Sequence, residues 1–268
     1  MSLSEQRYQK ILALLSQNTT LRTSELAVLL GVSEMTARRD LVILEKQGVL
    51  KRIHGGAMLS LMAKDAYILR DHDATKEKNT IARHVVHHLL SVLEKKTTPQ
   101  AIYLDSGTTL MAVAKALCQN QSIPALTMVT HSTNIACTLV EQMRSQRGRH
   151  RLHMIGGEIY QNTYSTFGED ALNAINRLKF DYFFLGASGF NDSSFTNINY
   201  VEIALKKALM RQSKETWLML DSSKWQQANF APICGYADIH KLFLGPDEHP
   251  QKTTIQASYP HLEIFRCN

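Results

Sequence analysis

The chain has 268 residues, 44% of them hydrophobic, and a formal net charge of +6 at pH 7, which predicts one small and one larger domain with buried cores. No charged stretch followed by an apolar run opens the chain, and no segment approaches about 18 uninterrupted apolar residues, so we expect a cytoplasmic protein without a membrane span. The four cysteines lie far apart and form neither a CxxC pair nor a Cys/His cluster, so we expect reduced thiols, no metal and no other cofactor.

The first sixty residues predict three short helices. Gly31 can take the positive φ that ends the second helix, and Ser33 can cap the third. Each helix buries one apolar stripe. The three stripes are Ile11, Leu14 and Leu15; Leu26, Ala27 and Leu30; and Ala37, Leu41 and Leu44.

The third helix leaves a basic N-terminal half on its exposed side, where Arg38 and Arg39 supply positive charge. A helix fits the major groove of DNA, and side chains of its first turns reach base edges. After Gly48, residues 49–57 form an apolar and basic ribbon with a glycine pair, which is typical of a β-wing lying on the DNA backbone. The alternative is a small helical interaction domain whose basic residues form a solvated face.

A dense set of residues in this region resembles the N-terminal signature of the DeoR family of sugar-responsive regulators. The set comprises Gly31-Val32-Ser33, Thr36, Arg38-Arg39-Asp40-Leu41, Leu44-Glu45, Gly48 and Arg52-Ile53-His54-Gly55-Gly56-Ala57. The resemblance implies that Thr36, Arg38 and Arg39 serve a recognition helix and that Arg52 and His54 serve the wing. We expect Asp40 to orient an arginine or the helix, since phosphates repel a carboxylate. The expected DNA contacts are Ser33, Glu34, Met35, Thr36, Arg38, Arg39, Arg52 and His54.

Residues 58–76 mix charged and apolar side chains without a sustained period, which favours a connector, and a helix is expected from Lys78 to about Leu93. His84 and His88 stand four residues apart on this helix, a spacing compatible with a metal site. No carboxylate or cysteine at helical spacing completes the site, so we favour a polar outer face.

From Ala101 onward, short apolar runs alternate with helical patterns, which predicts a mainly parallel sheet flanked by helices. Ligands bind such sheets beyond the carboxyl ends of the strands. The expected strands are Ala101 to Leu104, Leu126 to Thr130, Leu152 to Ile155, Tyr182 to Leu185, Trp217 to Leu220 and Leu242 to Leu244.

Three of these runs end in short hydroxyl-rich turns. The first turn is Asp105-Ser106-Gly107-Thr108-Thr109, where Gly107 lets the backbone approach an anion, the hydroxyls can donate to it and a helix N-terminus follows. The others are Thr130-His131-Ser132-Thr133-Asn134 and Asp221-Ser222-Ser223-Lys224. Together they favour a phosphate site neutralised by Lys224. The alternatives are that such turns are tight connections and that Asp105 and Asp221 cap the following helices.

These turns, together with Gly156-Gly157-Glu158, Phe167-Gly168, Asp181 to Gly189 and Glu202, resemble the DeoR-family C-terminal sensor domain, which is similar in fold to ribose-5-phosphate isomerases. The resemblance implies an effector site in this domain. Its expected phosphate contacts are Ser106, Gly107, Thr108, Thr109 and Lys224, and its expected contacts to sugar hydroxyls are Asp105, Ser132, Asn134 and Glu202. The expected fold is therefore α/β, with a winged helix-turn-helix (residues 1–58), a linker (59–77) and a sensor and oligomerisation domain (78–268).

The main rival is a sugar-phosphate isomerase or deaminase that carries a DNA-binding domain. Where the isomerases resemble Asp-Gly-Ala-Asp, this chain has Gly186-Ala187-Ser188, and a neutral serine cannot serve as the base. We therefore expect no catalytic residues.

We expect a homo-oligomeric repressor, a dimer or tetramer, that binds double-stranded operator DNA and is released by a phosphorylated sugar, because two half-sites add the contacts of two recognition helices. The basic segment Arg144 to His153 is interpreted as a solvated connector rather than a DNA contact.

Overall fold

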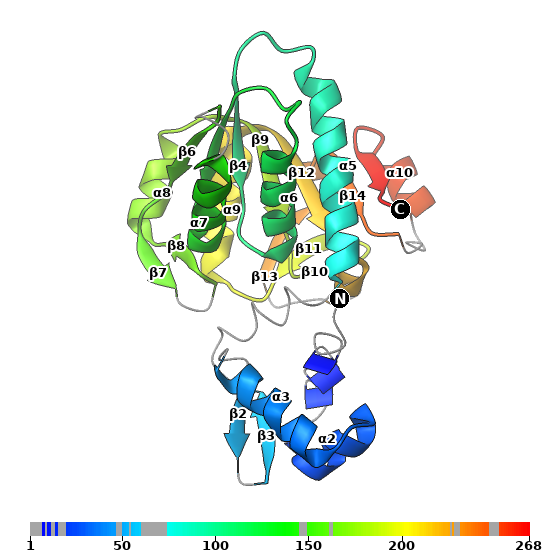
Figure 1. Ribbon diagram of the computed structural model, residues 1–268. Coiled ribbons are helices and arrows are strands. Elements are labelled where there is room, and N and C mark those ends of the chain that lie inside the picture. The colour runs from blue at the N-terminus through cyan, green and yellow to red at the C-terminus, as the bar shows by residue number, and fades with distance from the viewer. Residues whose placement is uncertain are drawn as a thin grey trace. The chain divides into compact units, whose positions relative to one another are not determined.

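A computed structural model describes residues 7–8, 10–11, 14–15, 20–46, 50–53, 55–59, 74–144, 149–160, 163–225, 227, 231–246 and 252–268. They belong to two units, Met1–Asp73 and Ala74–Asn268 (Figure 1). No helix within these described residues is long and apolar enough to cross a membrane.

The small unit combines helices with a three-stranded antiparallel sheet. Its elements are β1 (Leu21–Arg22), α2 (Thr23–Leu30), α3 (Glu34–Lys46), β2 (Leu50–Ile53) and β3 (Gly56–Leu59), with strand order β1-β3-β2. Gly31 ends α2 in the left-handed conformation, with φ of 67°, as expected. The predicted helical stripes meet in one core, which contains Ile11, Leu15, Leu26, Leu41, Leu44, Leu50 and Ala57.

The large unit is built on a seven-stranded sheet in which every pairing is parallel. Its strand order is β15-β14-β12-β9-β4-β5-β6. The strands are β4 (Gln100–Leu104), β5 (Leu126–Thr130), β6 (Arg151–Met154), β9 (Phe180–Gly186), β12 (Ser213–Leu220), β14 (Lys241–Leu244) and β15 (Glu263–Arg266). The first six match the expected runs, except that β6 ends at Met154, one residue before the expected end. The predicted fold class, a winged helix-turn-helix followed by a mainly parallel α/β unit, is confirmed.

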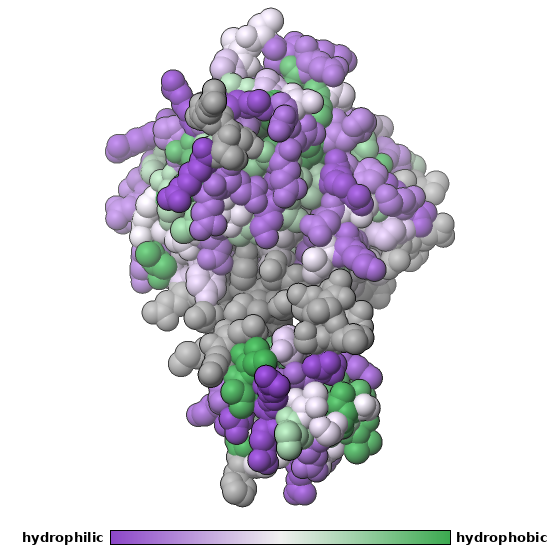
Figure 2. Space-filling view, in the orientation of Figure 1, coloured by the Kyte–Doolittle hydropathy of each residue, from purple (hydrophilic) through white to green (hydrophobic). Residues whose placement is uncertain are grey.

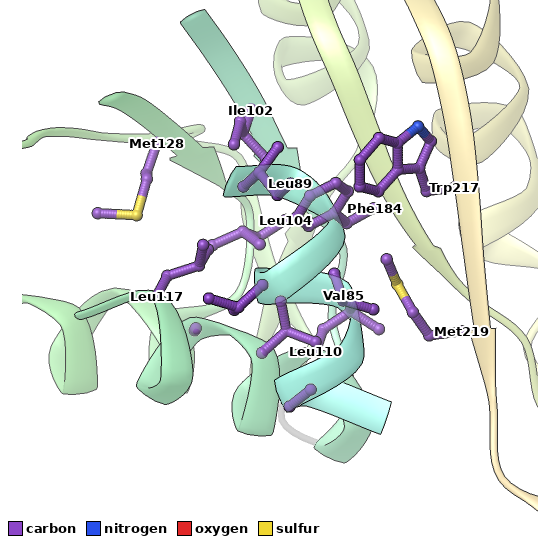
Figure 3. Close-up of a cluster of buried hydrophobic side chains, with 14 of the residues drawn as sticks. Val85, Leu89, Ile102, Leu104, Leu110, Leu117, Met128, Phe184, Trp217 and Met219 are labelled. Atoms are coloured by element: carbon purple, nitrogen blue, oxygen red, sulfur yellow. The ribbon is translucent and has the colours of Figure 1, made fainter. Parts of the chain in front are cut away.

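Helices cover both faces of this sheet (Figure 1). One face packs against α5 (Thr75–Leu93), α6 (Thr108–Gln119) and α7 (Thr133–Met143), and the other against α8 (Glu169–Asn176), α9 (Val201–Gln212) and α10 (Lys252–Ser258). Side chains alternate along each strand because the strand period is two: Phe184 packs on the first face and Phe183 on the second. Figure 3 shows the first face, where Val85 and Leu89 of α5 meet Phe184 and Trp217 of the sheet.

Helix α5 begins at Thr75, three residues before the expected start, and ends at Leu93. The expectation of a polar outer face is wrong for His88, which lies on the inner side of α5 and packs against three aromatic rings, with its centroid 4.6 Å from that of Phe265. Burial lowers the pKa of His88. The His84 ring bonds within the helix, with Nδ1 2.9 Å from the Thr80 carbonyl oxygen.

Two small antiparallel sheets extend beyond the main sheet. One is the hairpin of β7 (Glu158–Tyr160) and β8 (Ser165–Phe167), and the other contains β10 (Gly189–Phe190), β11 (Ser194–Asn197) and β13 (Ala231–Gly235). Short 3-10 turns η2 (Ser222–Lys224) and η3 (Tyr236–Asp238) follow β12 and β13. Apart from η2, which lies in the expected turn at residues 221–224, these elements were not expected from the sequence.

Candidate functional sites

The N-terminal half of α3 is exposed and fixed by a helix cap. Ser33 Oγ accepts a hydrogen bond from the Thr36 amide at 3.2 Å and lies 2.9 Å from Thr36 Oγ1. Met35 is 81% exposed, and Figure 2 shows apolar patches beside strongly hydrophilic ones on the small unit. Of the residues predicted to contact DNA on this helix, Thr36 is half-buried and Ser33, Glu34, Met35, Arg38 and Arg39 are exposed. This surface offers cations for phosphates and short side chains for base edges.

Asp40 lies on the buried side of α3 and holds an arginine. Its carboxylate accepts hydrogen bonds from Arg7 Nε at 2.8 Å and from Arg7 Nη2 at 3.2 Å. Asp40 is only 3% exposed. It therefore orients Arg7, in agreement with the sequence prediction.

The wing is the β2–β3 hairpin, and a side chain of α3 holds it. Glu45 accepts a hydrogen bond from the Arg52 amide at 2.9 Å, and its second oxygen lies 3.7 Å from the Arg52 guanidinium. Gly55 turns the chain with φ of 77°, and a Cβ on Gly56 would lie 2.3 Å from the Leu21 carbonyl oxygen of β1. His54 lies outside the described residues.

The three hydroxyl-rich turns all follow carboxyl ends of strands in one parallel sheet. They follow β4, β5 and β12, and only β9 separates β4 from β12. The chain leaves β4 toward β5 and later returns as β9 on the other side of β4. The ends of β4 and β9 therefore form the topological switch point at which ligands bind such sheets.

The turn after β4 has an open side next to the start of α6. Gly107 adopts φ of 111°, and a Cβ there would meet nothing within 4 Å. Ser106 and Gly107 are half-buried, whereas Thr108 and Thr109 are each 8% exposed. Gly107, which has no side chain, is the N-cap residue of α6, so the helix N-terminus faces this turn without a side-chain cap.

Asp105 is fully buried and joins this turn to the end of β9. Its Oδ1 accepts a hydrogen bond from the Ser106 amide at 2.8 Å, and its Oδ2 accepts from the Gly186 amide at 3.0 Å. Lys206 of α9 donates to the same Oδ2 at 2.5 Å. These bonds make Asp105 a positioning residue of the turn rather than the cap of α6, and its contact with a sugar hydroxyl stays a prediction.

Lys206 and Glu202 extend the buried polar network. Lys206 Nζ lies 3.5 Å from Glu202 Oε2, and Asn197 donates to the same oxygen at 2.7 Å. Burial alone would lower the pKa of Lys206, but the charges and hydrogen bonds of Asp105 and Glu202 outweigh it and raise that pKa. Ser188 also belongs to this network and donates a hydrogen bond to Asn197 Oδ1 at 2.7 Å.

His131 packs beside Asp105 at the end of β5. Its Nε2 lies 3.9 Å from Asp105 Oδ1, and its Nδ1 lies 3.0 Å from the Tyr103 hydroxyl. Burial lowers the pKa of His131 to about 4, although the charge of Asp105 opposes this shift. The ring is therefore neutral at pH 7.

The turn after β5 places its two predicted contacts differently. Ser132 is fully buried, and its Oγ accepts a hydrogen bond from the Ile135 amide at 3.4 Å as the cap of α7. Asn134 is half-buried. Roles of both in effector binding stay predictions.

The turn after β12 is held by a carboxylate from α5. Ser222 donates to Glu77 through its amide at 2.5 Å and through its hydroxyl at 2.9 Å. Asp221 is buried and accepts from the Ser223 hydroxyl, and Lys224 is half-buried in η2.

Two family models match the chain. The DeoR-like helix-turn-helix domain matches residues 7–60, and the DeoR C terminal sensor domain matches residues 73–245. The chain belongs to the DeoR family.

Named relatives of this DeoR-family chain are repressors. The Glycerol-3-phosphate regulon repressor of Escherichia coli is 33% identical over 98% of both proteins, and that of Haemophilus influenzae is 32% identical over 98% of this chain and 96% of the relative. The Lactose phosphotransferase system repressor of Staphylococcus epidermidis is 27% identical over 94% of this chain and 96% of the relative. Among solved structures, ribose 5-phosphate isomerase A of Neisseria gonorrhoeae has a TM-score of 0.37 at 14% identity, over 58% of this chain and 54% of that one.

Sequence reasoning missed three polar residues of the sensor unit of this DeoR-family chain: Lys206, Asn197 and Glu77. Lys206 had one usable signal, because positions 202, 205, 206 and 209 share the buried face of α9. No signal in the sequence indicated Glu77, since its hydrogen-bond partner Ser222 lies 145 positions later in the chain. Within the basic segment, Arg149 donates to the Gln121 carbonyl oxygen, and residues 145–148 lie outside the described part of the chain.

Proposed function

We propose that the chain is a sequence-specific DNA-binding repressor of an operon for carbohydrate use, and that a phosphorylated sugar or polyol bound at the carboxyl edge of the large sheet relieves repression. The observation that carries this proposal is the match to repressors along 98% of the chain. The exposed basic half of α3 supports the DNA contact.

The effector chemistry follows from the turns and from the relatives. The turn after β4 combines a positive-φ glycine, hydroxyls and a helix N-terminus, which are features that recognise phosphoryl groups. Relatives at 32 and 33% identity are named for the glycerol-3-phosphate regulon, so glycerol 3-phosphate is the first effector to test. The lactose phosphotransferase relatives at 27% make a hexose phosphate the second.

An enzymatic role fits the same region less well. Ser188 stands where the isomerases carry an acid, and its hydroxyl donates to Asn197. The Glu202 carboxylate accepts a hydrogen bond from Asn197 and pairs with Lys206 through the same oxygen, so that oxygen is already engaged within the protein. A sensor without turnover is therefore the function we favour.

We further propose that the repressor acts as a homo-oligomer, a dimer or tetramer. One recognition helix makes few base contacts, whereas two helices on half-sites about 34 to 36 Å apart add their contributions.

A gel-shift experiment tests the DNA-binding part. DNA selected from a random pool by the wild-type protein is mixed with Arg38→Ala/Arg39→Ala and with a control, Lys95→Ala/Lys96→Ala, which removes the same charge from exposed positions at the end of α5. We expect the first variant to lose specific retention with an unchanged circular dichroism spectrum, and the control to keep it. Equal retention by both variants would refute the assignment of α3 as the recognition helix.

A further inference from the structure

One carboxylate of α5, that of Glu77, is hydrogen-bonded to the turn after β12. Glu77 Oε1 accepts the Ser222 amide at 2.5 Å, and Glu77 Oε2 accepts the Ser222 hydroxyl at 2.9 Å. A backbone amide and a hydroxyl that converge on one acidic group form a small anion-binding arrangement. In this structure the arrangement holds an anion of the chain itself, the Glu77 carboxylate.

Gly245 makes room for the Glu77 carboxylate at the end of β14. A Cβ on Gly245 would lie 1.4 Å from Glu77 Oε1 and 2.4 Å from Glu77 Cδ, and the three nearest atoms all belong to Glu77. Gly245 does not have a positive φ. A glycine is therefore required here by the space that Glu77 occupies and not by the backbone conformation. The Gly245 amide donates to the Leu220 carbonyl oxygen, which joins the ends of β14 and β12.

The surroundings of the carboxylate are partly apolar. Cys267 is fully buried, and burial followed by the charge of Glu77 raises its pKa to about 12. Glu77 itself is half-buried. A charge in such surroundings interacts more strongly with its donors than it would in water.

Glu77 belongs to the first turn of the helix that follows the connector. Helix α5 begins at Thr75, and along the chain residues 60–73 lead to it from the DNA-binding unit. Its N-cap residue, Ala74, has φ of 51° and ψ of 30°, a left-handed conformation that strains a residue with a Cβ. Glu77 lies three residues after Ala74, so the Glu77–Ser222 contact joins the first turn of α5 to the turn after β12.

We propose that Ser222 and Gly245 form a subsite that takes the phosphoryl group of the effector together with the turn after β4, and that Glu77 fills this subsite until the effector displaces it. The proposal rests on the proposed function, because it assigns the regulatory step of the same sensor unit. Two anions cannot share one amide and one hydroxyl, since their like charges repel. Binding of the effector therefore frees the first turn of α5 and changes the start of the segment that leads to the DNA-binding unit.

Two variants remove the charged carboxylate from the subsite by different means. Glu77→Gln removes its charge, whereas Gly245→Ala keeps the charge and places a methyl group where Glu77 Oε1 lies. The control is Glu94→Gln, an exposed carboxylate at the other end of α5. Binding of glycerol 3-phosphate and of inorganic phosphate is measured by calorimetry, and affinity for the selected DNA by fluorescence anisotropy.

We expect Glu77→Gln to bind the phosphate compounds at least about fivefold more tightly than wild type, the lower end of ordinary coupling between sites. Gly245→Ala should bind them more weakly than wild type, because its methyl group fills the subsite itself. Without effector, both should bind the selected DNA more weakly, and glycerol 3-phosphate should change that affinity less. Glu94→Gln should behave as wild type. Thermal melting shows whether each variant is folded. If Gly245→Ala does not fold, the result for Glu77→Gln alone decides whether the subsite exists.

If wild type binds glycerol 3-phosphate and releases DNA while both variants behave as wild type, the Glu77 subsite is wrong and the proposed function stands. If wild type and all variants bind no phosphate compound, both proposals fall.

Discussion

Asp105 and Lys206 show how one buried ion pair can shape a binding turn. Two charges removed from water carry a large desolvation cost, which good geometry and further hydrogen bonds must offset. Here Asp105 accepts two backbone amides as well as the ammonium group, and Lys206 also donates to the Gly186 carbonyl oxygen at 3.1 Å. The pair therefore fixes the ends of β4 and β9 relative to each other.

Removal of one partner of this pair should destabilise the fold strongly. We expect Lys206→Met to lower the free energy of unfolding by about 3 to 5 kcal/mol in urea denaturation, because Asp105 would remain buried without its cation. Lys214→Met is the control, since Lys214 pairs with Asp181 but its side chain is 79% exposed, and it should cost less than about 1 kcal/mol. Equal losses for the two variants would contradict the positioning role.

His131 adds a pH dependence to the same region. In the folded state its pKa is about 4, mainly through burial, below the ordinary value of 6.5. The unfolded chain therefore binds more protons between these values, so stability falls as the pH falls through this window. Asp105, Lys206 and the Tyr103 hydroxyl are the polar groups that face the ring.

We expect wild type to lose about 2 kcal/mol more stability than His131→Gln between pH 7 and pH 5. Urea denaturation at both pH values measures this difference. The other buried histidines titrate in both proteins, so their contributions to the pH dependence of stability cancel in the comparison. Parallel pH dependence of the two proteins would show that His131 is not held neutral by burial.

At the scale of elements, the presentation of α3 depends on its two ends. Ser33 caps the exposed N-terminal half, and Glu45 near the C-terminal end holds the Arg52 amide of the wing. These contacts place the recognition helix and the wing in one rigid arrangement. Arg38 and Arg39 are exposed on this helix, where we propose that they contact DNA.

Loss of the cap should weaken both stability and DNA binding. Ser33→Ala should lower the free energy of unfolding of the small unit by about 1 kcal/mol, and Ser33→Thr should retain most of it because threonine also caps helices. Urea denaturation followed by circular dichroism, with a gel shift on the same samples, measures both effects. A Ser33→Ala protein as stable as Ser33→Thr would rule out the cap.

The main elements could be predicted because their signals are local. The six predicted strand runs alternate with helical patterns, and Gly31 and Ser33 mark the ends of helices. The edge strand β15 has only two apolar residues between Glu263 and Arg266 and gave no such signal. The small sheets have strands of only two to five residues, too short for a periodic pattern.

The candidate site could be predicted in its turns and, through the family resemblance, at Glu202. Asp105, Ser106 and Gly107 follow a strand directly, so position alone indicates them. Lys206 and Glu77 act through partners 101 and 145 positions away, and such contacts are not visible in the local sequence. Charged side chains on helices are also mostly solvated, so a charged residue in a helix does not by itself indicate a buried network.

At the scale of the whole molecule, the two units must be coupled for repression to respond to an effector. Coupling is reciprocal: if the effector weakens DNA binding, DNA weakens effector binding by the same factor. A positive net charge of +6 adds a salt-dependent attraction to DNA that the effector does not change. Coupling must therefore be measured at one fixed salt concentration.

The most direct test of the regulatory account is the affinity of the wild-type protein for its selected DNA, measured by fluorescence anisotropy at constant salt with and without saturating phosphate compounds. We predict that glycerol 3-phosphate or a hexose phosphate weakens DNA binding by roughly 5- to 150-fold, whereas the same compounds without phosphate do not. An unchanged affinity with every compound, including any that raises the melting temperature of the protein, would contradict the account.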